Sequence, residues 1–131
     1  RPVGSMIVKR TLPGGRLVVI HGDRYPAAVR VARLRRDFPQ ARAIVCGHSH
    51  RMLVDRTAQP CLLNPGAAGR VRTDGGASAL ILFAWETGWR QLGLRVHPDG
   101  LRAWRFPAAA AGCVDGFPGP VRPDPGPDRL P

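Results

Sequence analysis

The sequence predicts a mixed α/β fold, and three observations support that prediction. A short, β-branched apolar run at residues 16–20 precedes a helical pattern, and a second apolar run at residues 41–46 follows it. A buried strand, a helix and another buried strand in that order are typical of an α/β sheet. Two longer strand-like segments, residues 77–85 and 89–96, come later and indicate an added hairpin.

The first strand and the helix have clear boundary signals. Pro13-Gly14-Gly15 introduces the strand with a turn, and Pro26 stands where the first turn of a helix tolerates proline. Apolar residues then recur at helical spacing, with arginines on the other faces, until Pro39 ends the pattern. These apolar residues are Ala27, Val31, Leu34 and Phe38. We therefore expect an amphipathic helix between the two strands.

Further short strands are expected downstream. Residues 52–55 and 61–63 are candidates, and Asn64-Pro65-Gly66 is predicted to form a turn. Residues 77–85 and 89–96 pair around Glu86-Thr87-Gly88, and residues 101–106 add an edge strand. In residues 89–96, Leu92, Leu94 and Val96 alternate with Gln91, Gly93 and Arg95, as expected of a half-buried strand.

Domain organisation follows from composition. Residues 1–106 hold all the predicted elements, whereas residues 107–131 are a low-complexity segment rich in Ala, Pro and Gly. Such a segment buries too little apolar surface to offset its conformational entropy. We predict one folded unit over residues 1–106 and a disordered, Pro-rich tail.

Charge and cysteine content narrow the function classes. The chain has 20 Lys and Arg against 9 Asp and Glu, a net charge of +11. The arginines are scattered and aromatics are few, so attraction to an anionic small-molecule substrate is favoured over dedicated nucleic-acid binding. No apolar stretch approaches the ~18 residues that span a bilayer, so no membrane partner is expected. Three cysteines without paired spacing favour a reducing cytoplasm, and the oligomeric state stays open.

Three histidines follow the two predicted strands of the α/β unit. His21 comes directly after the first, and His48 and His50 come just after the second. Loops at the carboxyl ends of neighbouring strands are where open α/β sheets gather ligands. Imidazole is a common ligand of divalent first-row metals, and the adjacent glycines allow the backbone to turn sharply. The pattern predicts a metal site at this edge of the sheet.

Three segments and one residue form a pattern in the first two-thirds of the chain: Ile20-His21-Gly22-Asp23, Cys46-Gly47-His48-Ser49-His50-Arg51, Leu63-Asn64-Pro65-Gly66-Ala67-Ala68 and Arg72. In order and approximate spacing they resemble the second half of the calcineurin-like phosphoesterase superfamily, above all its small bacterial and archaeal phosphodiesterase branch. The resemblance covers about residues 13–83. It implies the C-terminal portion of a four-layer α/β sandwich and a metal-dependent phosphodiesterase or phosphatase, in which a metal-bound hydroxide attacks phosphorus.

The resemblance also implies roles for individual residues. His21 and His48 would bind one metal ion and His50 the other. Asn64 and Gly66 would shape the rim near the substrate, and Arg72 is a weaker candidate for phosphate contact. Two divalent ions are implied, with Mn²⁺ favoured and Fe, Zn, Ni or Mg as alternatives. The implied partner is a small phosphate ester.

The chain departs from the family in its carboxylates. The Asp-x-His, Gly-Asp-x-x-Asp and Gly-Asn-x-Asp motifs are absent, so three histidines stand without a certain carboxylate ligand, and no catalytic residue is assigned. We therefore expect an N-terminally truncated fragment that alone binds metal weakly and hydrolyses phosphodiesters poorly.

Other interpretations remain open at this point. A non-catalytic scaffold of the same fold, like the retromer scaffold subunit, would explain the missing motifs. A structural zinc site could use Cys46, His48, His50 and Cys61, whose ligand types suit zinc. His97 is expected in an exposed turn, and the three tryptophans are expected to pack in the sheets rather than bind a ligand.

Overall fold

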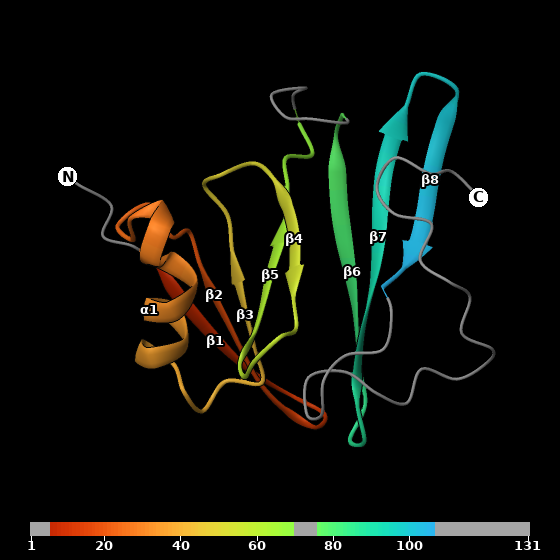
Figure 1. Cartoon of the computed structure of the whole chain (residues 1–131). Coiled ribbons are helices and arrows are strands. Elements are labelled where there is room, and N and C mark those ends of the chain that lie inside the picture. The colour runs from red at the N-terminus through yellow and green to blue at the C-terminus, as the bar shows by residue number, and fades with distance from the viewer. Residues whose placement is uncertain (1–5, 70–75, 107–131) are drawn as a thin grey trace.

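The computed structural model describes residues 6–69 and 76–106, which form two β-sheets and one α-helix in three layers (Figure 1). The helix covers one face of the larger sheet, and the smaller sheet packs on its other face. The mixed α/β class is as predicted. The predicted tail, residues 107–131, lies outside the described residues.

The larger sheet has five strands in the order β1-β2-β3-β5-β4. Their bounds are β1 Ile7–Leu12, β2 Gly15–Ile20, β3 Ala43–Cys46, β4 Met52–Asp55 and β5 Cys61–Pro65. The three central strands are parallel, and β1 and β4 pair antiparallel at the two edges. Parallel strands are buried on both faces, which explains why β3 and β5 read as continuous apolar runs.

The predicted helix begins later than expected. A 3₁₀ turn, Ala27–Val29, follows Pro26, and α1 spans Arg30–Asp37. The last hydrogen bond of the helix runs from the Phe38 N–H to the Leu34 carbonyl. Pro39 has no backbone N–H and cannot continue the helix. The separate 3₁₀ turn holds Val29 at φ −121°, outside helical values.

One core cluster lies between α1 and the larger sheet. Leu34 is the one fully buried residue of the helix, and Val31 and Phe38 pack beside it half-buried. The cluster is formed by Val18, Ile20, Leu34, Ala41, Ile44, Cys46 and Leu62. This packing fixes β2 and β3, the two strands that precede the histidines.

The smaller sheet comprises β6 Ser78–Ala84, β7 Trp89–His97 and β8 Gly100–Arg105, joined antiparallel in that order. Trp89 is completely buried between the sheets, and its Nε1–H donates to the Pro13 carbonyl at 2.6 Å. Its ring packs with Ala43, Cys61 and Leu63 in a second core cluster. Trp89 and the 6% exposed Trp104 thus pack in the sheets, as predicted.

Strand β7 shows the predicted alternation, and its polar face is the more deeply buried one. Gln91 is 1% exposed and Arg95 7%, whereas Val96 is 54% exposed. Gln91 and Gly93 lie on the same face of the strand as Trp89, whose ring must enter the core. Gly93 leaves room for the Trp104 ring, which would come within 2.6 Å of an added Cβ. Alternation alone does not say which face turns inward.

Element boundaries differ from the predictions in two further places. Strand β1 was not predicted, because its sequence Ile-Val-Lys-Arg-Thr-Leu has exposed polar residues typical of an edge. Strand β5 runs on through Asn64 and Pro65, two residues that were expected in a turn. In the described part of the chain, no helix has the length and apolar character needed to cross a bilayer.

Candidate functional site

The candidate site lies at the carboxyl ends of β2 and β3. These strands are parallel neighbours, and Ile20 pairs with Cys46 as the last residue of each. The loops that follow therefore leave the same edge of the sheet side by side. Gly47 N–H donates to the His21 carbonyl at 3.0 Å and extends the pairing beyond the strands.

His21 and His48 are brought together by this arrangement. Their ring centroids lie 5.4 Å apart, with the ring planes at 84° to one another. Both side chains are exposed, and His50 is half-buried nearby in sequence. The pairing of His21 with His48 is the one that the resemblance implies for a single metal ion, although their role as ligands stays a prediction.

Two of the histidines adopt a left-handed backbone conformation. His48 has φ 69° and His50 has φ 60°, values that are uncommon for residues with a Cβ. The intervening Ser49 N–H donates to the Gly47 carbonyl at 2.8 Å, which closes a tight turn. Such strained residues cluster at functional sites, because the surrounding structure must hold them in place.

Asn64 braces that turn from the neighbouring strand β5. Its Nδ2 donates to the Gly47 carbonyl at 3.1 Å and to Ser49 Oγ at 3.0 Å. Its Oδ1 accepts the Gly66 N–H at 2.9 Å, and the residue is only 3% exposed. These bonds engage the amide within the protein, so Asn64 positions the histidine turn. The predicted contact with substrate stays a prediction.

Gly66, the other predicted rim residue, is joined to Asn64 through its own N–H. It has φ 81°, and a Cβ there would approach Ser78 Oγ to 2.0 Å. Ser78 itself donates its hydroxyl to the Pro65 carbonyl at 2.9 Å. Ser78 was not singled out from the sequence, where its one signal is a polar residue near the start of a predicted strand. Arg72, the third predicted substrate residue, lies outside the described residues.

The alternative zinc site is not assembled in the structure. Across residues 6–69 and 76–106, no group of three or more His, Cys, Asp or Glu side chains is placed to hold a metal ion. Cys46 and Cys61 are both buried, in two different core clusters. Burial raises the pKa of the Cys46 thiol above its ordinary value, against a smaller opposing effect of Arg30. Cys46 is therefore a core residue.

The same observation tests the fit of the implied metal centre. The described residues provide a neighbouring pair of imidazoles, a suitable donor type for a divalent ion. They do not add the further ligands that would complete a site, and the exposed Asp23 is not grouped with the histidines. The structure thus contains part of a ligand set, and it supports no reaction step through a metal ion.

Comparison with protein families identifies one match. The family model for the calcineurin-like phosphoesterase superfamily domain matches residues 5–86, which is more than half of the chain. The matched region contains the three histidines and the Asn64 brace. No functionally curated protein is similar enough in sequence to count as a match.

Several solved structures share the fold at low sequence identity. Vacuolar protein sorting 29 (Vps29) from Cryptosporidium parvum superposes with a TM-score of 0.68 at 15% identity, over 79% of this chain and 57% of that one. Wild-type Vps29 of Entamoeba histolytica complexed with Zn²⁺ gives 0.64 at 14%, over 76% and 59%. A predicted phosphoesterase from Streptococcus pneumoniae gives 0.57 at 14%, over 76% and 62%. The chain thus spans about three-fifths of these proteins.

Proposed function

The chain belongs to the calcineurin-like phosphoesterase superfamily, and on that premise we propose that its domain hydrolyses phosphate esters with the help of divalent metal ions. The observation that supports this most is the close approach of His21 and His48 at the carboxyl edge of the larger sheet. Superfamily members generally bind divalent metals. A purely structural role would not need two exposed imidazoles side by side.

The proposed roles divide among the three histidines. His21 and His48 would each supply an imidazole nitrogen to one ion, and His50 would supply one to a second. A bound metal would supply Lewis acidity and neutralise charge on the phosphoryl group. Asn64 keeps the turn between His48 and His50 closed through its bonds to Gly47 and Ser49. Manganese is favoured on family grounds, and zinc is supported by the Zn²⁺ complex of the Entamoeba Vps29.

The resemblance implies that a complete centre would also use carboxylate ligands, and the described residues group none with the histidines. We therefore expect the 131-residue chain to bind metal weakly and to turn over slowly. The proposed substrate is a small phosphate ester, to which the net charge of +11 gives a general attraction. Cys46 and Cys61 are free thiols, in keeping with a proposed cytoplasmic location.

A second candidate function is a non-catalytic, protein-binding role. The likeness to Vps29 structures favours it, because their name assigns those proteins to vacuolar protein sorting. The incomplete ligand set of the described residues favours it as well. The two candidates differ in whether metal-dependent turnover accompanies metal binding.

The decisive measurement is hydrolysis of bis(p-nitrophenyl) phosphate with added Mn²⁺ or Zn²⁺. The rate for His48→Ala should fall by about 100-fold or more, because even an outer partner of a metal ligand contributes 10–100-fold. His97→Ala is the matched control, since His97 ends β7 on the other sheet and should leave the rate unchanged. Equal rates in the wild type and His48→Ala would refute the catalytic assignment.

Metal binding is measured separately by NMR. Titration with Mn²⁺ should broaden the ring signals of His21, His48 and His50 before those of His97. Selective broadening with no metal-dependent hydrolysis, measured at a protein concentration high enough to detect the slow turnover expected of this chain, would support the protein-binding candidate instead. Broadening of all four histidines together would refute the metal site itself.

A further inference from the structure

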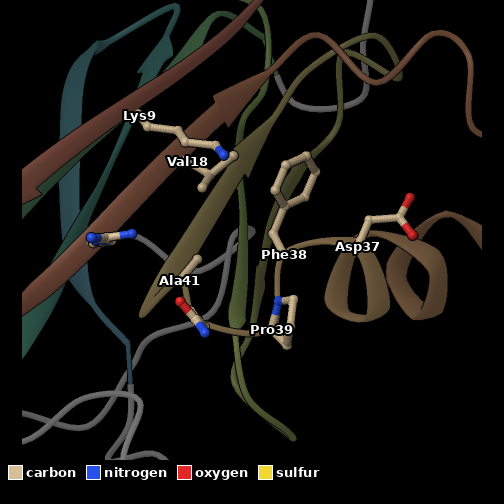
Figure 2. A pocket seen from close by; sticks show the side chains of 8 residues that line it. Lys9, Val18, Asp37, Phe38, Pro39 and Ala41 are labelled. Carbon is tan, nitrogen blue, oxygen red and sulfur yellow. The ribbon is translucent and has the colours of Figure 1, made fainter.

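A separate cavity of about 270 Å³ lies between the end of α1 and the β1–β2 hairpin (Figure 2). Lys9 of β1 pairs with Val18 of β2, and Arg16 lies two residues before Val18. Cross-strand partners and alternate residues share a face, so all three side chains lie on the face that carries α1. The cavity is thus walled on one side by the sheet.

The opposite wall is formed where the helix ends short of the hairpin edge. Phe38 N–H donates to the Leu34 carbonyl at 3.0 Å, and Ala41 N–H donates to the Phe38 carbonyl at 3.2 Å. This compact turn carries Phe38, Pro39 and Gln40 along the cavity. Because backbone hydrogen bonds hold the turn, the wall is positioned before any ligand arrives.

The charges in the cavity are unbalanced. Neither Lys9 nor Arg16 has an ion-pair partner within residues 6–69 and 76–106. Asp37 is the one acidic residue of the lining, and its carboxylate points away from the cavity in Figure 2. That carboxylate accepts hydrogen bonds from Tyr25 Oη at 2.8 Å and Arg36 Nε at 3.3 Å. The cavity therefore presents two cations and no available anion.

The remaining surface of the cavity is apolar and includes an aromatic ring. Lys9 Nζ lies 5.9 Å from the centroid of the Phe38 ring, within the range of a cation–π contact. Val18, Pro39 and Ala41 complete the apolar part (Figure 2). A few polar groups over a mostly apolar floor are typical of small-molecule sites, and the volume is close to the lower end for such sites.

We propose that this cavity binds a small anion with a flat apolar body, such as an aromatic phosphate or carboxylate. Lys9 and Arg16 pair with the anionic group, and the apolar body packs against Phe38. The site is distinct from the histidine edge, because Arg16 is near the start of β2 and His21 follows its end. Five residues of extended strand separate them by about 16 Å.

The test is an NMR titration of the ¹⁵N-labelled chain with phenylphosphonate in the presence of EDTA. Its carbon–phosphorus bond resists hydrolysis, and the chelator keeps the metal site out of the measurement. Saturable shifts should centre on the amides of Lys9, Arg16, Phe38 and Gln40. Lys9→Gln and Arg16→Gln should each weaken binding about fivefold, the effect of one modest ion pair.

Two controls separate a built site from general attraction to a basic chain. Arg10→Gln removes an equal charge from the next residue of β1, whose side chain lies on the other face, and should change affinity less than about twofold. Methylphosphonate should bind more weakly than phenylphosphonate, and Phe38→Leu should remove most of that difference. Benzoate, titrated in parallel, distinguishes a carboxylate from a phosphoryl group.

Three results would overturn the proposal. The first is an absence of saturable shifts with both phenylphosphonate and benzoate. The second is equal weakening by Arg10→Gln and Lys9→Gln. The third is equal affinity for methylphosphonate and phenylphosphonate. Each is independent of the proposed phosphoesterase activity, since no metal ion and no turnover is involved.

Discussion

Left-handed backbone at His48 and His50 links the local conformation of the chain to its candidate chemistry. An L-residue in this region brings its Cβ close to the following carbonyl, a strain of roughly 1–2 kcal/mol. Glycine would avoid that strain, yet histidine occupies both positions. The hydrogen bonds that Asn64 donates to Gly47 and Ser49 hold the turn closed and offset part of the strain. The strained backbone at His48 and His50 thus lowers the stability of the folded chain at two residues that the metal site would need.

The strain can be measured by substituting His50, which has φ 60°. His50→Gly should be more stable than His50→Ala by about 1 kcal/mol, because glycine adopts this backbone conformation freely and alanine does not. Both variants lose the imidazole, so the comparison isolates the backbone. Urea unfolding followed by circular dichroism gives the two free energies.

A comparison of Ala28→Gly with the wild type provides the control. Ala28→Gly should instead destabilise the chain, because Ala28 lies within the 3₁₀ turn, where glycine loses more conformational freedom on folding than alanine does. If His50→Gly were no more stable than His50→Ala, the left-handed conformation would not be a source of strain in the folded chain.

At the residue scale, the sequence indicated three histidines as candidate metal ligands, a role that stays a prediction, but it did not indicate the contacts that hold their turn. Gly-His-Ser-His after an apolar strand indicated a ligand turn because residue types and spacing are visible in the sequence. The Asn64 brace depends on β5 lying beside β3, a pairing between strands whose register no local pattern specifies. The left-handed angles of His48 and His50 flank Ser49, which accepts one of the Asn64 bonds, and no local pattern indicates them either.

At the element scale, an ion pair joins the helix to the edge of the larger sheet. Arg35 Nη2 of α1 donates to Asp55 Oδ1 of β4 at 3.1 Å, and its Nε donates to the Pro60 carbonyl at 2.8 Å. Thr57 also donates its hydroxyl to Asp55 at 2.6 Å. Burial acts to raise the pKa of Asp55, but the bonds from Thr57 and Arg35 outweigh it and lower the pKa overall.

This pKa shift predicts how stability depends on pH. The folded chain favours the ionised form of Asp55. The contribution of this carboxylate to the free energy of unfolding is therefore present above the unfolded pKa of about 3.9 and is lost as the pH falls below that value. Asp55→Asn should lower stability by about 1–3 kcal/mol at pH 7, where a charge-assisted network is lost. The variant and the wild type should begin to approach one another near pH 4 and converge once the pH lies below the lowered pKa of folded Asp55.

Urea unfolding at several pH values between 2 and 7 measures this dependence. Asp99→Asn serves as the control, because Asp99 pairs with Arg102 in an exposed turn and should contribute little. Parallel pH profiles for Asp55→Asn and the wild type would show that the ion pair does not join these elements energetically.

Elements with a strong local pattern were predicted well, whereas the edge strand β1 was not. Strands β2, β3 and β4 were expected within two residues of their observed bounds, since short apolar runs bounded by turns are distinctive. Strand β1 was missed because an edge strand is stabilised by pairing with β2 rather than by its own pattern. The alternation in β7 did not indicate its inward face, because Trp89, not the leucines, decides it.

At the scale of the whole molecule, two small hydrophobic cores, one on each face of the larger sheet, stabilise a strongly basic chain. The net charge is +11 over 131 residues. Even within the smaller sheet, burial and then the neighbouring charge of Arg105 hold the pKa of Arg90 below its usual range. Like charges held close together oppose the compact state, so electrostatic self-repulsion should limit the stability of this chain.

Added salt should therefore stabilise the protein. Raising NaCl from about 10 mM to about 100 mM shortens the screening length from about 30 Å to about 10 Å. The free energy of unfolding should rise by roughly 0.5–1 kcal/mol, comparable with one exposed ion pair. Replacing two exposed arginines, Arg10→Glu with Arg24→Glu, changes the net charge by four, from +11 to +7, and should reduce the salt effect.

A salt-independent unfolding midpoint in the wild type, or an equal salt effect in both proteins, would show that local contacts outweigh net charge. A decrease with salt would mean that favourable ion pairs such as Arg35–Asp55 dominate the surface, and the arginine-rich composition would then carry no cost to folding.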